Sequence, residues 1–218
     1  MPFVPKHPVP VFPLPGVVLF PGAQLPLHVF ELRYRTMVRE ALSAERVIAL
    51  ALLRPGWERD YQGSPEFHPL GCLARIEAVA WLPNDCYDLR LLGLTRARLG
   101  RAVREFPYRA VQAVVMPQDP LAEDDPLVQI ERRALIEAAV RLAQLAAPEG
   151  EPPGAIGEGL AFEPLVNTLC MGLAAGPELK LALLEMDSLL DRARRAREMM
   201  EEQLRWAGRR QEGGGERN

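Results

Sequence analysis

The chain has 218 residues, with 26 Lys+Arg against 29 Asp+Glu and 48% hydrophobic residues. These values are typical of an ordinary globular protein, and they exclude a collagen and a coiled-coil rod. The length suits one large domain or two small ones, which bury about 70% of their unfolded surface. A formal net charge of −3 gives no general attraction to nucleic acid or to an anionic membrane.

The residues that most often carry chemistry stand in no familiar motif. The cysteines are widely spaced and form no C-x-x-C, and no histidine stands in an H-E-x-x-H sequence. Neither Lys6 nor Lys180 follows the glycine pattern of a P-loop. The prolines of residues 1–15 interrupt any signal peptide, and no apolar run reaches the ~18–20 residues that cross a bilayer. We therefore expect a cytoplasmic protein without membrane contact, metal or cofactor.

Short strand patterns dominate the chain up to residue 115. The start is rich in proline and is interpreted as a run of turns. Strands are predicted at residues 17–20, 47–52, 73–76, 87–94 and 111–116. Their spacing favours a sandwich or a barrel. One helix is predicted at residues 31–42, with Leu32, Met37, Val38 and Leu42 turned toward one end of the sheet.

Helical patterns follow an acidic, proline-rich linker near residue 117. Helices are predicted at residues 126–146, 164–174 and 178–207, with a Pro/Gly-rich loop at 148–164. We expect the last helix to carry i,i+4 ion pairs such as Arg194 with Glu198 and Arg197 with Glu201. The predicted organisation is a strand domain at 1–118, a helical subdomain at 119–207 and a disordered tail at 208–218.

Several motifs of the first half resemble a known family. The stretch VFPLPGVVLFPG at residues 11–22, followed by LPLHVFELRY at 25–34, closely resembles the opening of the substrate-binding N-terminal domain of Lon proteases. The segments GCLARI at 71–76 and LLGLTRAR at 91–98 match two strands of that family. Residues 165–167 and 180–192 look like its helical part. The resemblance covers residues 9–116 densely and 160–205 more sparsely.

The resemblance implies an α+β fold, in which a PUA-like β pseudobarrel precedes a helical subdomain. Full Lon proteases continue with an ATPase module and a Ser-Lys peptidase module, and this sequence contains neither. Ser188 and Lys180 are separated by ~12 Å along one predicted helix, so they cannot form a dyad. We therefore expect a free-standing, non-enzymatic protein that binds unfolded polypeptides or protein clients, and that could deliver them to a separate protease.

The same motifs also have a physical interpretation that needs no family. Gly22 permits a turn, and Gly93, inside an apolar strand, indicates a bulge or a close approach of two backbones. The prolines at 13, 21 and 26 remove N–H donors where a sheet edge ends. Glu31 and an arginine at 33 or 35 are expected to be structural.

The candidate binding surface is the loop that joins two predicted strands at residues 54–69. Its aromatic residues Trp57, Tyr61 and Phe67 would contact apolar peptide segments, with Arg96 and Arg98 as a polar rim. The alternative is that these rings fold back and close one end of the barrel.

Two further hypotheses remain open. A PUA-like RNA-binding module would use the only notable basic cluster, interleaved with Phe106 and Tyr108. Its members are Arg90, Arg96, Arg98, Arg101, Arg104 and Arg109. The scarcity of lysine and the negative net charge make nucleic acid the weaker prediction. The C-terminal helix, with its basic and acidic stretches, could also mediate homo-oligomerisation.

Overall fold

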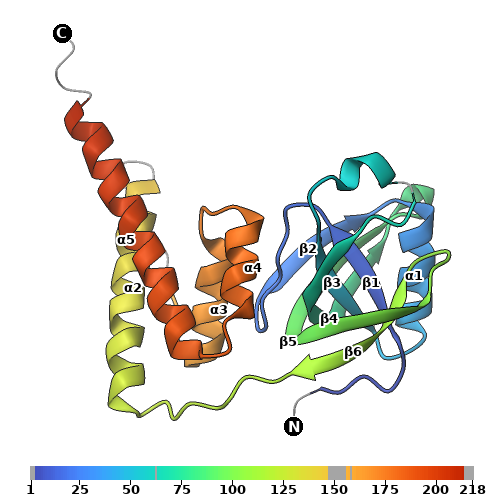
Figure 1. Ribbon diagram of the computed structural model, residues 1–218, viewed down its shortest axis with the longest axis horizontal. Helices are drawn as coiled ribbons and strands as arrows, with labels where there is room; N and C mark the ends of the chain where they lie inside the picture. The colour runs from blue at the N-terminus through green and yellow to red at the C-terminus, as the bar shows by residue number, and fades with distance from the viewer. Residues whose placement is uncertain (1–2, 62, 147–155, 158, 214–218) are drawn as a thin grey trace. The chain divides into compact units, whose positions relative to one another are not determined.

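The structure is a computed structural model that describes residues 3–61, 63–146, 156–157 and 159–213. Packing divides the chain into two compact units (Figure 1). The first unit contains Met1–Gln118 together with Ala175–Glu185. The second contains Asp119–Ala174 together with Met186–Asn218.

The first unit is built on one closed sheet. Its strands are β1 (Val9–Leu14), β2 (Gln24–Val29), β3 (Val47–Leu53), β4 (Phe67–Trp81), β5 (Tyr87–Arg104) and β6 (Ala110–Met116). The strand order is β2-β5-β4-β3-β1-β6, and the long β5 also pairs with β6, which closes the sheet (Figure 1). β1 runs parallel to β3, whereas the other pairings are antiparallel. A sheet domain joined to helices confirms the predicted α+β class.

The proline-rich start differs from the prediction. It holds a strand, β1, whereas residues 17–20 form no strand, and their side chains at Val18, Leu19 and Phe20 are buried. β1 tolerates Pro13 because the amide of Val11 donates to the Arg109 carbonyl at 2.8 Å, and backbone groups two residues apart face the same edge. The Pro13 nitrogen, which has no N–H to donate, therefore lies at an edge that β6 no longer covers.

Two glycines allow backbones to approach closely inside the barrel. A Cβ on Gly93 would lie 2.1 Å from the Phe20 carbonyl oxygen. Gly93 also donates its amide to the Ala23 carbonyl at 2.9 Å and accepts from the Gly22 amide at 2.8 Å. The β4–β5 register shifts beside Gly93, and Gly22 has a φ of 78°. The predicted bulge, close approach and turn are thus confirmed.

Helix α1 (Leu32–Leu42) packs on β1 and β3 through Tyr34, Met37 and Val38. Its first residue differs from the prediction, because Leu32 is 66% exposed rather than turned inward. The helical phase explains this, since Leu32 lies away from the buried stripe at positions 34, 37, 38 and 41.

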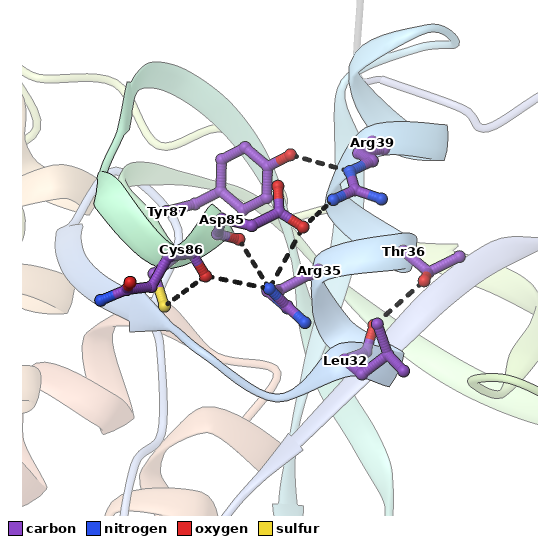
Figure 2. A network of polar contacts seen from close by, with 8 residues as sticks. Leu32, Arg35, Thr36, Arg39, Asp85, Cys86 and Tyr87 are labelled. Atoms are coloured by element: carbon purple, nitrogen blue, oxygen red, sulfur yellow. Dashed lines mark hydrogen bonds and ion pairs between the residues drawn. The ribbon is translucent and has the colours of Figure 1, made fainter.

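The outer face of α1 is tied to the turn between β4 and β5 (Figure 2). Arg35 donates to the Asn84 carbonyl and to the Asp85 carboxylate, each at 3.1 Å. Arg39 donates to the Tyr87 hydroxyl at 3.0 Å and to the same carboxylate. Asn84 and Asp85 both have left-handed backbone angles, so the arginines hold a turn that is unfavourable on its own. This network fixes the helix on the barrel.

Helix α4 (Pro177–Glu185) belongs to the unit of the sheet rather than to a contiguous helical subdomain. Leu181, Leu183 and Leu184 of this helix are buried. Its Glu178 carboxylate lies 3.4 Å from His68 Nε2 of β4. The predicted helix at 178–207 is therefore interrupted, because its first part packs on β4 and β5.

The second unit contains α2 (Pro126–Ala146), α3 (Phe162–Gly172) and α5 (Leu189–Gly213). The start of α5 is capped by Ser188, whose hydroxyl accepts from the Asp191 amide at 3.2 Å. Buried Arg192 donates to the Met186 carbonyl at 2.6 Å and to Asn167 of α3 at 2.8 Å. These bonds stabilise the break before α5.

The charged face of α5 pairs partly as predicted. Arg197 binds Glu201 at 2.8 Å, which confirms that i,i+4 pair, and it also binds Glu131 of α2 at 2.8 Å. Arg194 pairs with Asp191 at 3.2 Å instead of Glu198. Because α5 extends to Gly213, the part of the predicted tail at 208–213 is helical, and residues 214–218 lie outside the described residues. Most of the predicted loop at 148–164 also lies outside them.

None of the described helices combines the length and apolar character needed to traverse a bilayer. Oligomerisation through the C-terminal helix stays a prediction.

Candidate functional site

The three aromatic residues of the predicted binding loop are half-buried rather than open. Trp57 opens a short 3-10 helix and packs edge-on against Tyr61, with ring centroids 5.3 Å apart. The Tyr61 hydroxyl donates to the Glu31 carboxylate at 2.6 Å. The Phe67 ring lies under the Arg109 guanidinium, 4.4 Å from its centroid. Tyr61 and Phe67 therefore anchor the loop to the barrel, and their role in binding stays a prediction.

The prediction that Arg96 belongs to an exposed polar rim was wrong. Arg96 is only 2% exposed, and it donates to the Leu184 carbonyl of α4 at 3.0 Å. Arg96 and Arg98 lie two residues apart and share one face of β5, but α4 covers only the first. Arg98 is exposed, as predicted for a rim residue.

The basic cluster considered for RNA binding does not form one exposed surface. Arg104 binds Glu40 at 2.9 Å and stacks on the Tyr108 ring at 3.9 Å. Arg96 is buried and Arg109 is half-buried. Only Arg90, Arg98 and Arg101 of this cluster are fully exposed. Phosphate binding would therefore depend on few of the predicted arginines.

A groove of about 630 Å³ opens on the first unit. Four segments form its walls: the edge of β1, the first turns of α1, the loop before β4 and the turn between β5 and β6. The third segment is the end of the predicted binding loop, at residues 63–65. Sequence reasoning assigned β1 and the start of α1 to turns or structural roles, and it considered Phe106, Tyr108 and Arg109 only for RNA binding. We call this site the β1–α1 groove.

Large apolar side chains line the β1–α1 groove and are exposed to solvent. Phe106 is 78% exposed and Leu32 is 66% exposed. Tyr34, which also lines the groove, is buried and stacks on Phe12 at 4.2 Å. Burial raises the pKa of Tyr34 to about 12, so its hydroxyl stays protonated near neutral pH. Exposed apolar groups gathered beside a cavity are typical of a binding site.

The groove opens where the β1–β6 ladder ends. The antiparallel register pairs Val9 with Val111 and Pro10 with Ala110. Continuing that register would place Pro13 opposite Pro107, and neither proline has an N–H to donate. The ladder therefore stops, and this edge of β1 is left without unpaired amides.

The charged residues that line the groove are the neutral pair of Arg33 and Glu31, the separate Arg109, and Glu105, whose carboxylate accepts from the Ser64 hydroxyl at 3.4 Å. Arg33 donates to the Glu31 carboxylate at 3.0 Å, to the Tyr61 carbonyl at 2.7 Å and to the Gly63 carbonyl at 3.0 Å. Through its bonds to the two carbonyls, Arg33 connects the loop to α1. Arg109 donates to the Pro65 carbonyl, and its burial lowers the pKa of the guanidinium.

Sequence reasoning missed the groove, although one signal was present. Phe106 and Pro107 form an apolar pair in a turn between strands, where polar residues are the rule. Leu32 was expected to be buried, and Arg109 was considered only as a member of the basic cluster. Within the described segments, no group of three or more His, Cys, Asp or Glu could hold a metal ion.

Curated relatives of the chain are Lon proteases. It is 33% identical to Lon protease 2 of Myxococcus xanthus over 100 residues, which are 46% of this chain and 12% of that protein. It is 32% identical to the Lon protease of Chloroflexus aurantiacus over 136 residues, 62% of this chain and 16% of that protein. The matched region is thus a small fraction of the relatives' length.

Solved structures share the fold over nearly the whole chain. The N-terminal domain of the Mycobacterium avium complex Lon protease superposes with a TM-score of 0.64 at 16% identity, covering 89% of this chain and 98% of that one. A Lon N-terminal domain protein from Xanthomonas campestris gives 0.57 at 23% identity, covering 87% and 96%. The family model of the ATP-dependent protease La (LON) substrate-binding domain matches residues 8–202. The chain therefore belongs to the family of Lon substrate-binding domains.

Proposed function

We propose that the protein binds unfolded polypeptide segments in the β1–α1 groove and does not cut them. The observation that carries the proposal is the exposure of Phe106 and Leu32 beside a cavity on a rigid barrel. A binding pocket for an extended chain needs apolar contacts for its side chains. Phe106 and Leu32 supply such contacts, and β1 lies along the same groove.

The family relationship supports the same function at a coarser level. The matching family is that of a substrate-binding domain, and the curated relatives are proteases. Binding without cleavage would allow the protein to sequester clients or to pass them to a separate protease.

Three of the nucleophilic side chains that the structure describes, Cys72, Cys170 and Ser64, fit a non-catalytic role. Burial raises the pKa of the Cys72 thiol to about 12, so it is not a thiolate at neutral pH. Cys170 is also buried. The Ser64 hydroxyl donates to the Glu105 carboxylate at 3.4 Å, an arrangement without the histidine or lysine base that would activate it.

The proposal is tested by fluorescence anisotropy of labelled casein, titrated with the full chain at ~50 and ~200 mM salt. Binding should change little with salt, because apolar contacts dominate it. Phe106→Ala should weaken binding roughly ten-fold, as expected for the loss of a contact that buries much of a phenyl ring.

Phe30→Ala is the matched control, because Phe30 is 62% exposed and does not line the groove. Its affinity for casein should equal that of the unchanged protein. Equal losses in both variants, or binding only to labelled single-stranded RNA with a steep salt dependence, would contradict the proposal.

A further inference from the structure

Arg109 is held in one orientation on the wall of the β1–α1 groove. Its carbonyl accepts from the Val11 amide at 2.8 Å, and this bond holds the Arg109 backbone next to β1. Its guanidinium lies 4.4 Å from the centroid of the Phe67 ring and donates to the Pro65 carbonyl. A guanidinium that is stacked and bonded in this way loses little further freedom when it binds a ligand.

The charge of Arg109 lacks the compensation that its neighbours have. Arg33 pairs with Glu31 at 3.0 Å, and Arg104 pairs with Glu40 at 2.9 Å. Among the described residues, no carboxylate oxygen lies within 4.0 Å of the Arg109 guanidinium. Glu105 interacts with it only at longer range. A guanidinium has five N–H donors, and a half-buried one binds most strongly to a carboxylate.

We propose, on the basis of the function proposed above, that Arg109 pairs with the carboxylate of an Asp or Glu side chain in the bound polypeptide. The groove then selects segments in which an acidic residue lies near a large apolar one. The apolar side chain contacts Phe106 and Leu32, which line the same cavity. In an extended segment, side chains two positions apart lie on one face, about 7 Å from each other. An acidic residue two positions from the apolar one places both side chains on the face of the segment that is turned to the groove.

The groove favours an acidic side chain over the carboxylate at the end of a chain. Arg109 lies beside Val11, and the edge of β1 continues past it to Pro13. A chain that runs on past Arg109 contacts this part of the groove. A chain that ends at Arg109 leaves this part of the groove empty.

The test compares short labelled Gly/Ser peptides that carry one Phe and differ only in the residue two positions after it. This residue is Glu, Gln or Lys, and all peptides are amidated at the C-terminus. The full chain should bind the Glu peptide about five-fold more tightly than the Gln peptide, the upper range for a solvent-accessible ion pair. The Lys peptide should bind most weakly.

Arg109→Gln should abolish the preference for Glu over Gln, so that the two peptides bind this variant with equal affinity. Arg109→Lys keeps the positive charge and should retain a smaller preference for Glu over Gln. A retained preference would show that the charge recognises the acid, and that the effect of Arg109→Gln does not come only from the loss of stacking on the loop. Arg98→Gln is the matched control, because Arg98 is an exposed arginine that does not line the groove. This variant should discriminate like the unchanged protein.

The different failures are distinguishable. Equal binding of the Glu and Gln peptides overturns the role of Arg109 and leaves polypeptide binding intact. A preference that survives in Arg109→Gln, or that is lost equally in Arg98→Gln, also overturns it. A Gln peptide with a free C-terminal carboxylate is also compared with the amidated Glu peptide. If the Gln peptide with the free terminus binds more tightly, Arg109 recognises chain ends instead. Failure of all peptides and of casein to bind refutes the proposed function itself.

Discussion

Replacing Gly93 with alanine tests whether the barrel closes at the point that the structure indicates. The added Cβ would lie 2.1 Å from the Phe20 carbonyl oxygen and 2.9 Å from its carbon. That is about 1 Å inside the ordinary C···O contact distance. The obstacle is backbone rather than a flexible side chain, so β5 and the segment before β2 must move apart.

The expected cost follows from what such a movement disrupts. Overpacking of a well-packed interior costs about 1–3 kcal/mol. The two backbone hydrogen bonds of Gly93, to Ala23 and Gly22, contribute about 1 kcal/mol each and weaken as the strands separate. Alanine restricts the unfolded chain more than glycine does, and this offsets the loss of stability by about 0.4–1 kcal/mol. We therefore expect Gly93→Ala to lower the free energy of unfolding by about 2–4 kcal/mol.

The free energy of unfolding is measured by urea titration followed by circular dichroism, with the slope of the transition compared between variants. Gly172→Ala is the control, because Gly172 ends α3 and a Cβ added there would meet no neighbouring atom within 4 Å. It should change stability by less than about 1 kcal/mol. A loss below about 1 kcal/mol for Gly93→Ala would refute the close approach.

Three further predictions concern other parts of the first unit. Tyr61→Phe should cost about 1–2 kcal/mol in urea unfolding, because the Glu31 carboxylate loses a donor at 2.6 Å; an unchanged midpoint would show that this bond does not hold the loop. The hydrogen bond from Arg39 lowers the pKa of Asp85 below its ordinary value of 3.8. Its stabilisation is therefore present above that pH and is lost as the pH falls through the lowered value, so the reduction of Tm by Asp85→Asn should be largest at pH ~7 and should shrink as the pH falls below 3.8; a pH-independent difference would contradict this. In native protein at pH ~8, a thiol reagent should label half-exposed Cys86 rapidly and leave Cys72 unreacted, because burial raises the pKa of Cys72 to about 12; rapid reaction of Cys72 would argue against its burial.

The candidate site shows where sequence reasoning fails. Trp57, Tyr61 and Phe67 were chosen because aromatic residues in a loop are often exposed, yet bonds to Glu31 and stacking under Arg109 hold two of them to the barrel. Arg96 was chosen by strand alternation, which predicts the face of a strand but not what covers it. Helix α4 covers Arg96, and it lies almost ninety positions later in the sequence.

Local geometry followed from the sequence alone. Gly93 and Gly22 required a close approach and a turn, and the alternating and helical patterns predicted β3 to β6 and α1 to α3, whereas the single helix predicted at 178–207 is divided into α4 and α5. These features depend on the conformational limits of single residues and on short-range periodicity, which the sequence contains directly.

Only the tertiary structure decided which surface is available for binding. Pro13 and Pro107 face each other only because β1 and β6 pair, and the groove opens where that pairing stops. The uncompensated charge of Arg109 depends on which acids reach it through space. Exposure and charge compensation are properties of residues that are distant along the chain, so no local pattern could predict them.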